Sequence, residues 1–386
     1  MLRLYDTRRR GIFPFRARGT VMMYVCGVTP YDTTHLGHAR TFLVFDVLAR
    51  LLEATGQRVR YAQNVTDIDE SILQRAARDG VDWQALGTRE ERKFVDDMDR
   101  LNWRRPDVMP HATKEIAQMH EIIEGLLRKD VAYRVAGGVY FCVAKARDYG
   151  ALSRLSPARM HAILARQDDA ALDDPARCHP NDFALWRTVP SGPTWPSPWG
   201  PGRPGWHIEC SAMSLHHLGP QIDIHGGGND LIYPHHENEI AQSETYTGKR
   251  PFTRFWLHTG MARLAGAKMS KSDGNMVFVR QALERVLPEA LRLYLLDSHY
   301  RRAFDHDEKK LARAVTRQGV LAERLGRPQR SDAIGRDAAT RAVMSALEDD
   351  LHTDRAIREL ERRAKGASER AKPSLRAVAH EVLGIV

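Results

Sequence analysis

The strongest constraint on the fold is a strand–helix–strand pattern near the N-terminus. Residues 21–28 (VMMYVCGV) are almost continuously apolar, as in a strand that is buried on both faces. Residues 36–55 place apolar side chains at helical spacing, and residues 58–65 form a second strand-like run. Two strands joined by one helix at this spacing run parallel, with a right-handed crossover. The pattern therefore predicts a Rossmann-like α/β sheet.

The rest of the chain divides into segments of different character. A hairpin is expected at 131–144, turning at Gly137-Gly138, and from about Arg280 the pattern looks wholly helical. Residues 187–204 are rich in Pro, Gly and Trp and are expected to form an ordered loop. We therefore expect a Rossmann-like catalytic domain with an inserted subdomain, followed by an α-helical bundle. Its expected parts are 1–104 (first catalytic half), 105–187 (inserted connective subdomain), 188–279 (second catalytic half) and 280–386 (C-terminal helical region).

Composition indicates a globular protein with a basic surface. Of the 386 residues, 42% are hydrophobic and 28% charged, and the net charge is +9. The longest apolar run, Thr41 to Leu52, is interrupted by Asp46 and Arg50, so no membrane span is expected. The first ten residues lack the apolar stretch of a secretion signal, and we expect a cytoplasmic monomer. The positive charge suits a phosphate-bearing partner, although a solvated helical surface explains it equally well.

Two short motifs suit phosphate chemistry. His35-Leu36-Gly37-His38 follows the first strand, where a helix N-terminus offers N–H groups and a positive dipole end. Lys268-Met269-Ser270-Lys271-Ser272 forms a Ser/Lys loop that could stabilise charge developing on a polyphosphate. Two surface histidines and a solvated basic loop are the simpler alternatives. The two motifs together, about 230 residues apart, are much more specific than either alone.

A third group of residues has metal-binding character. Cys26 ends the first strand, Cys210 lies in GWHIEC, and His235 and Glu239 share one helical face at i,i+4 spacing. Two thiolates, an imidazole and a carboxylate make a tetrahedral zinc set. Such a zinc ion can also bind a substrate thiolate, which a hydroxyl group could not match. A purely structural zinc site, or cysteines buried in the core without metal, remain open.

The paired HLGH and KMSKS motifs resemble the HIGH and KMSKS signatures of class I aminoacyl-tRNA synthetases. Together with YVCGVTPYD, NVTDID, GRPGWHIECSAM and DIHGGGNDLIYPHHENEIAQSE, they resemble cysteinyl-tRNA synthetases and their offshoot, the cysteine ligase of the mycothiol pathway. The resemblance implies a ligase that uses ATP with Mg²⁺, forms cysteinyl-AMP and holds one Zn²⁺. By this resemblance the catalytic residues are His35, His38, Lys268 and Lys271, and the residues that bind ATP are Gly37, Gly226, Gly227, Gly228, Lys271 and Ser272. The resemblance also implies that cysteine is bound by Thr66, Trp206 and Asp230. The zinc ligands that it implies are Cys26, Cys210, His235 and Glu239.

The resemblance leaves the acceptor of the cysteine open. The chain ends at Val386, where synthetases of this family usually continue into an anticodon-reading domain, and segments such as PTWPSPWGPGRPGW resemble the offshoot. Arg40, Glu239 and the basic C-terminal region are synthetase-like instead. On balance the sequence favours the amine of an aminosugar, glucosaminyl-inositol, over tRNA-Cys. A non-catalytic tRNA-binding paralogue ranks last, because it predicts loss of HLGH or KMSKS and both are intact.

Overall fold

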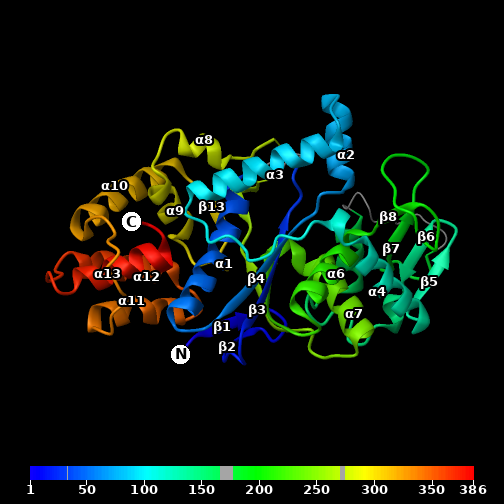
Figure 1. Cartoon of the computed structure of the whole chain (residues 1–386), viewed down its shortest axis with the longest axis horizontal. Helices are drawn as coiled ribbons and strands as arrows, with labels where there is room; N and C mark the ends of the chain where they lie inside the picture. The colour runs from blue at the N-terminus through cyan, green and yellow to red at the C-terminus, as the bar shows by residue number, and fades with distance from the viewer. Residues whose placement is uncertain (33, 166–176, 270–273) are drawn as a thin grey trace.

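The computed structural model describes all residues except 33, 166–176 and 270–273, and its centre is a four-stranded parallel sheet (Figure 1). The strand order is β10-β9-β3-β4. The strands are β3 (Val21–Val28), β4 (Val59–Val65), β9 (Ile222–Gly228) and β10 (Thr253–Thr259). Helix α1 (Leu36–Ala54) connects β3 to β4, which run parallel. The predicted Rossmann-like sheet is confirmed.

Helices cover both faces of the sheet. Met23 and Val25 of β3 belong to a core shared with α1, whereas Tyr24 and Cys26 belong to a second core shared with α6 (Trp206–Leu218). This division follows from the strand geometry, since successive side chains point to opposite faces. Helix α7 (Glu237–Thr247) packs against α6. Cys26 thus faces the layer that also carries the other predicted zinc ligands.

The part of the chain between the two sheet halves carries a separate antiparallel sheet, which lies on the opposite side of the central sheet from the C-terminal helices (Figure 1). Its strands are β5 (Ala132–Val135), β6 (Gly138–Phe141), β7 (Phe183–Thr188) and β8 (Gly202–Pro204). The same part of the chain also contains α2 (Glu70–Asp79), α3 (Trp83–Arg100), α4 (Ile116–Arg128) and α5 (Pro157–Leu164); of these, α3 packs through Phe94 and Met98 on the core that contains α1. The predicted hairpin is confirmed. The loop expected at 187–204 is wrong in part, because β8 pairs with β7 within it.

The C-terminal region is a helical bundle. Its helices are α8 (Val279–Leu283), α9 (Pro288–Leu296), α10 (Glu308–Leu325), α11 (Ala338–Glu348), α12 (Thr353–Ala364) and α13 (Lys372–Ala377), followed by a helical turn at Val378–Leu383. One strand interrupts them: β13 (Phe304–His306) pairs in parallel with β11 (Ala262–Leu264). Strand β11 also pairs with β12 (Ala267–Lys268). The wholly helical expectation is therefore wrong at β13, where pairing with a distant hairpin decides the local structure.

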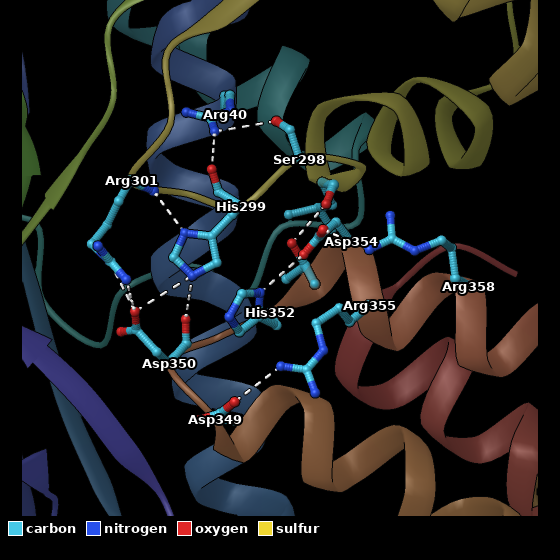
Figure 2. A network of polar contacts seen from close by, with 12 residues as sticks. Arg40, Ser298, His299, Arg301, Asp349, Asp350, His352, Asp354, Arg355 and Arg358 are labelled. Carbon is cyan, nitrogen blue, oxygen red and sulfur yellow. Dashed lines mark hydrogen bonds and ion pairs between the residues drawn. The ribbon is translucent and has the colours of Figure 1, made fainter. Parts of the chain in front are cut away.

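A buried carboxylate joins the bundle to the rest of the molecule (Figure 2). Asp350, in the turn between α11 and α12, is fully buried, and its Oδ1 accepts hydrogen bonds from the Tyr5 N–H and the Tyr300 hydroxyl at 2.8 and 2.9 Å. Its Oδ2 accepts two bonds from the Arg301 guanidinium at 2.8 and 2.6 Å. The turn is sharp, since Asp350 and Leu351 both have positive φ values, 55° and 51°.

None of the described helices combines the length and apolarity that crossing a membrane requires.

Arg40 connects the same region to the start of α1. Its guanidinium is buried and donates to the carbonyls of Gly260, His299 and Arg302 at 3.2, 3.0 and 3.2 Å. Figure 2 shows it directed at the segment that also carries Arg301. Arg40 therefore holds the helix that begins with HLGH against the chain that follows β10. These hydrogen bonds give Arg40, which the sequence marks as synthetase-like, a structural role within the protein.

Candidate active site and metal centre

His35 shapes the start of α1. It is the residue before the helix, and its Nδ1 accepts hydrogen bonds from the backbone N–H groups of Gly37 and His38 at 3.1 and 3.2 Å. An imidazole thus acts as the helix cap, a position usually held by Ser, Thr, Asp or Asn. The His35 and His38 rings stack with their centroids 3.6 Å apart. Both imidazoles therefore lie side by side at the positive end of α1.

The segment after the KMSKS motif forms hydrogen bonds with the start of α1. The Leu36 N–H donates to the Val277 carbonyl at 2.9 Å, and the Val279 N–H donates to the Thr34 carbonyl at 2.8 Å. Gly37 leaves no room for a side chain, because a Cβ there would lie 2.9 Å from the Ala262 Cβ. The start of the HLGH helix is therefore in direct backbone contact with the segment that follows the KMSKS motif.

A cavity of about 200 Å³ opens at the carboxyl ends of β3, β9 and β10. This is the edge of an open parallel sheet at which ligands bind. Its lining includes Cys26, Gly27, His35, Gly37, His38, Thr41, Gly228, Asp230, Thr259, Gly260, Lys268 and Met269. The predicted zinc ligand Cys26 and the predicted catalytic residues His35, His38 and Lys268 therefore share one cavity.

The lysine loop is described only at its start. Lys268 lies in β12, and its Nζ is 3.3 Å from Oδ2 of Asp230; both side chains are about half exposed. Lys271 and Ser272, predicted to contact ATP, lie outside the described residues. Asp230, predicted to hold the ammonium group of cysteine, is thus placed on the lysine side of the cavity.

The predicted zinc ligands form a compact buried quartet. Cys26, Cys210, His235 and Glu239 place their ligand atoms within 4.8 Å of one another, and all four residues are buried. The Cys26 Sγ lies 3.8 Å from the Cys210 Sγ and 3.6 Å from Oε1 of Glu239. Nε2 of His235 is 3.2 Å from the same carboxylate oxygen. Residues from β3, α6, the helical turn Ile232–His236 and α7 are thus brought to one point.

A strand irregularity and a glycine position Cys26. The pairing of β3 with β4 shifts register between Val25 and Val28, as at a β-bulge. Gly27 packs so closely on β4 that a Cβ there would lie 1.8 Å from the Asn64 carbonyl oxygen. The Gly27 N–H donates to the Asn64 side-chain oxygen at 2.8 Å. The end of β3 is therefore fixed on both sides of Cys26.

Three further histidines orient the quartet. The Cys26 Sγ is 3.2 Å from Nε2 of His236, whose Nδ1 lies 2.8 Å from Nε2 of His258. Nε2 of His225 lies 2.9 Å from Oε2 of Glu239. Ligands of metal ions are usually held by such outer hydrogen bonds. The sequence alone assigns these histidines no role.

The arrangement around His235 decides between two overlapping ligand sets. Cys26 and Glu239 could also bind a metal together with His225 and His236. Those two imidazoles are already bonded to the carboxylate and the thiol. Nδ1 of His225 is buried without a hydrogen bond to any described residue, but its Nε2 already faces Glu239. By contrast, Nδ1 of His235 lies 2.9 Å from Nδ1 of His207, while its buried Nε2, 3.2 Å from Oε1 of Glu239, makes no hydrogen bond with any described residue. The orphaned nitrogen fits the predicted quartet, which therefore suits a zinc ion.

Burial controls the protonation of the quartet. Burial, followed by the neighbouring Cys210 and Glu239, raises the pKa of the Cys26 thiol well above its usual value, and burial also raises that of Cys210. Burial lowers the pKa of His235 well below its usual value, so its imidazole is neutral. A dication favours both thiolates and needs a neutral imidazole. The donor set thus matches a bound divalent cation.

The residues predicted to contact cysteine and ATP lie in different parts of the site. Trp206 stacks near the quartet, with its ring centroid 4.3 Å from that of His235. Thr66 is buried, and its hydroxyl accepts from the Asn64 amide at 3.1 Å. Of the three glycines, Gly228 lines the cavity, whereas a Cβ on Gly226 would lie 2.1 Å from the Phe45 ring of α1. Gly226 therefore serves close packing of helix on sheet.

Comparison with known proteins identifies the family. Residues 13–316 match the family described as "tRNA synthetases class I (C) catalytic domain". The chain belongs to the class I cysteinyl-tRNA synthetase family. A cysteine–tRNA ligase of Dehalococcoides mccartyi is 48% identical over 299 residues, covering 77% of this chain and 64% of that protein. The cysteine–tRNA ligase of Paramagnetospirillum magneticum is 47% identical over 361 residues, covering 92% and 77%. The chain thus spans roughly two thirds to three quarters of the length of these relatives.

Solved structures agree on the fold. Methionyl-tRNA synthetase of Mycobacterium tuberculosis, in complex with methionyl-adenylate, superposes with a TM-score of 0.64 at 16% identity, covering 94% of this chain and 89% of that one. LeuRS of Agrobacterium radiobacter K84, in a ternary complex with tRNA, gives 0.61 at 11% identity, covering 95% and 83%. This chain therefore has the class I aminoacyl-tRNA synthetase fold.

Proposed function

We propose that this protein activates cysteine with ATP as cysteinyl-AMP and transfers it to tRNA-Cys. The observation that carries the first step is the shared cavity: Cys26 of the metal-ligand quartet lines it together with His35, His38 and Lys268. With these roles, a thiol-recognising centre and a phosphate-binding helix start would meet at one sheet edge. The carboxylate of a cysteine held by its sulfur at the quartet would point toward the phosphates.

Each described residue has a role in this step. His35 and His38 would contact ATP phosphates at the positive end of α1, and Gly37 would let the nucleotide approach the backbone. Lys268 would stabilise the charge on departing pyrophosphate, with Mg²⁺ entering as part of the substrate. A zinc ion held by Cys26, Cys210, His235 and Glu239 would supply a soft Lewis acid for the substrate thiolate. Thr66 and Trp206 would position the cysteinyl moiety beside it.

We infer a division of labour along the chain. Residues 1–104 and 188–279 would form the catalytic unit, with 105–187 inserted between its halves and 280–386 acting as a helical support. Strand β8 (Gly202–Pro204) modifies this division, since it completes the sheet of the insertion. The Asp350 and Arg40 networks support the idea that the bundle and the catalytic unit move as one body.

The names of the relatives support tRNA as the acceptor over the aminosugar that the sequence favours. Both relatives described above are named cysteine–tRNA ligase. The net charge of +9 suits a polyanionic acceptor. Glu239 completes the quartet in the structure, and this carboxylate is a synthetase-like feature of the sequence.

Two assays on the full chain test the two steps separately. Cysteine-dependent exchange of pyrophosphate into ATP measures activation, and acid-precipitable label from radioactive cysteine measures charging of bulk bacterial tRNA. We expect both to be positive, with serine at least 100-fold poorer in exchange. Exchange without charging would contradict the tRNA acceptor, and glucosaminyl-inositol would then be tested. Absence of cysteine-dependent exchange would contradict the activation step itself.

A further inference from the structure

A second group of metal-ligating side chains lies where α4 meets α6. Glu115 immediately precedes α4, and His216 and His217 lie in the last turn of α6. Oε2 of Glu115 is 2.7 Å from Nδ1 of His216, and its Oε1 is 2.8 Å from Nε2 of His217. The ligand atoms of the three residues lie within 4.8 Å of one another. Two imidazoles and a carboxylate thus converge on one point.

The Glu115 carboxylate faces the two imidazoles and does not cap helix α4, which begins at the next residue. Glu115 occupies the position before α4, yet its side chain makes no capping bond to the first N–H groups of that helix. Only 6% of the residue is exposed, and within the described chain its ion-pair partners are the two histidines. Buried carboxylates are normally matched by a cation. A cation bound between the carboxylate and the two imidazole nitrogens would provide this match.

The surroundings suit a bound cation that is open to solvent. The two histidines lie at the C-terminus of α6, the negative end of the helix dipole. The His216 side chain is 47% exposed and that of His217 is 21% exposed, which leaves an entry path on one side. Three protein ligands with one open position form a common coordination pattern for Zn²⁺.

We propose that Glu115, His216 and His217 bind a divalent transition-metal ion such as Zn²⁺ in an open, three-ligand site. This site is separate from the quartet, since His216 follows Cys210 by six residues, roughly 9 Å along the helix axis. The ion would join the first turn of α4 to the last turn of α6, the helix that carries Cys210. The site goes beyond the proposed function and does not depend on it.

Zinc titration of the full chain tests the site. The protein is first loaded with one equivalent of Zn²⁺, and further Zn²⁺ is then titrated in competition with a chromophoric chelator. Glu115→Gln keeps the shape of the side chain, and His216→Asn changes a half-exposed residue, so both should fold. Glu124→Gln is the matched control, because it removes a carboxylate from the exposed face of the same helix, where Glu124 pairs with Arg128. Far-UV circular dichroism and urea midpoints verify folding.

We expect the wild type and Glu124→Gln to bind two Zn²⁺ per chain. In Glu115→Gln and His216→Asn the second ion should bind at least 10- to 100-fold more weakly, the loss seen when even outer-shell partners of a metal are removed. In Cys210→Ser the quartet should be weakened while the second site persists. A single equivalent in the wild type, or a second ion that binds equally in all variants, would overturn the proposal.

Discussion

Asp350→Asn tests whether the buried carboxylate holds the bundle onto the catalytic unit. Asparagine tolerates the positive φ of 55° at this position, so the substitution removes charge without new backbone strain. It keeps an oxygen acceptor for the Tyr5 N–H and the Tyr300 hydroxyl. It replaces the oxygen that faces Arg301 with an NH₂ donor, so two donors then face each other. Arg301 keeps partial access to water, because 36% of its side chain is exposed.

The structure sets the size of the effect. Two hydrogen bonds to a charged acceptor contribute about 1.5–3 kcal/mol each at most, and partial solvation of Arg301 reduces their loss. We therefore expect Asp350→Asn to lower the free energy of unfolding by about 2–4 kcal/mol. The adjacent Asp349→Asn is the matched control: it breaks an exposed ion pair with Arg355, and we expect a loss of at most about 1 kcal/mol. Figure 2 shows the two carboxylates on opposite sides of the turn.

The assay is urea unfolding of the full chain followed by circular dichroism, at several pH values. Burial alone would raise the pKa of Asp350, but hydrogen bonds from His299 and the Tyr5 N–H, together with Arg301, hold it below its usual value of 3.8. A lowered folded-state pKa adds stability that is complete above the unfolded value and is lost as the pH falls through the folded value. The difference between wild type and Asp350→Asn should therefore be full at neutral pH and shrink below about pH 4. Equal losses for Asp349→Asn and Asp350→Asn, or a pH-independent difference, would refute the reasoning.

Three further predictions concern the candidate site and its helix. Lys268→Ala should lower the rate of pyrophosphate exchange by about 10²–10³-fold. The urea midpoint should stay unchanged, because the Lys268 side chain is half exposed. Unaltered exchange would remove Lys268 from the mechanism. Cys210→Ser should reduce the zinc content of the dialysed protein and its preference for cysteine over serine, whereas full zinc content measured by mass spectrometry would exclude this ligand. Gly37→Ala should reduce exchange at least 10-fold, because its Cβ would meet that of Ala262 at 2.9 Å. Gly87→Ala, which meets no atom within 4 Å in helix α3, should instead gain about 0.5–1 kcal/mol in unfolding free energy and leave exchange unchanged.

Local periodicity predicts the elements of this fold well, because their own residues decide them. Residues 21–28 form the predicted strand, and α1 ends within one residue of its predicted limit. Strand β13 escapes this reasoning. Its three residues become a strand only because Ala262 to Leu264 offer a free edge about 40 residues earlier. Pairing between distant segments is not encoded in the spacing of either one.

The candidate site shows the same limit. The quartet could be predicted because thiols, imidazole and carboxylate are distinctive ligand types, even when far apart in sequence. The histidines that orient it could not: His258 lies in an ordinary buried strand, and only the parallel pairing of β10 with β9 brings it beside the HHENE segment. The sequence also gives no sign that the missing side chain of Gly226 accommodates Phe45 of α1, while its predicted contact with ATP stays a prediction.

The end of β3 explains how one cavity could serve both the amino-acid recognition and the phosphate chemistry that we propose. Val25 packs with α1 and Cys26 packs with α6, because successive strand residues face opposite layers. The chain then leaves the sheet at Val28 and enters α1 at Leu36, so the same strand end supplies a metal ligand on one face and the HLGH helix on the other. Gly27 lies between the two, lines the cavity and is fixed by Asn64, so a substrate that bridged them would pass this residue. The bulge at this point therefore sets the distance between the thiol site and the phosphate site, and a change in β3 register would uncouple them even with every ligand intact.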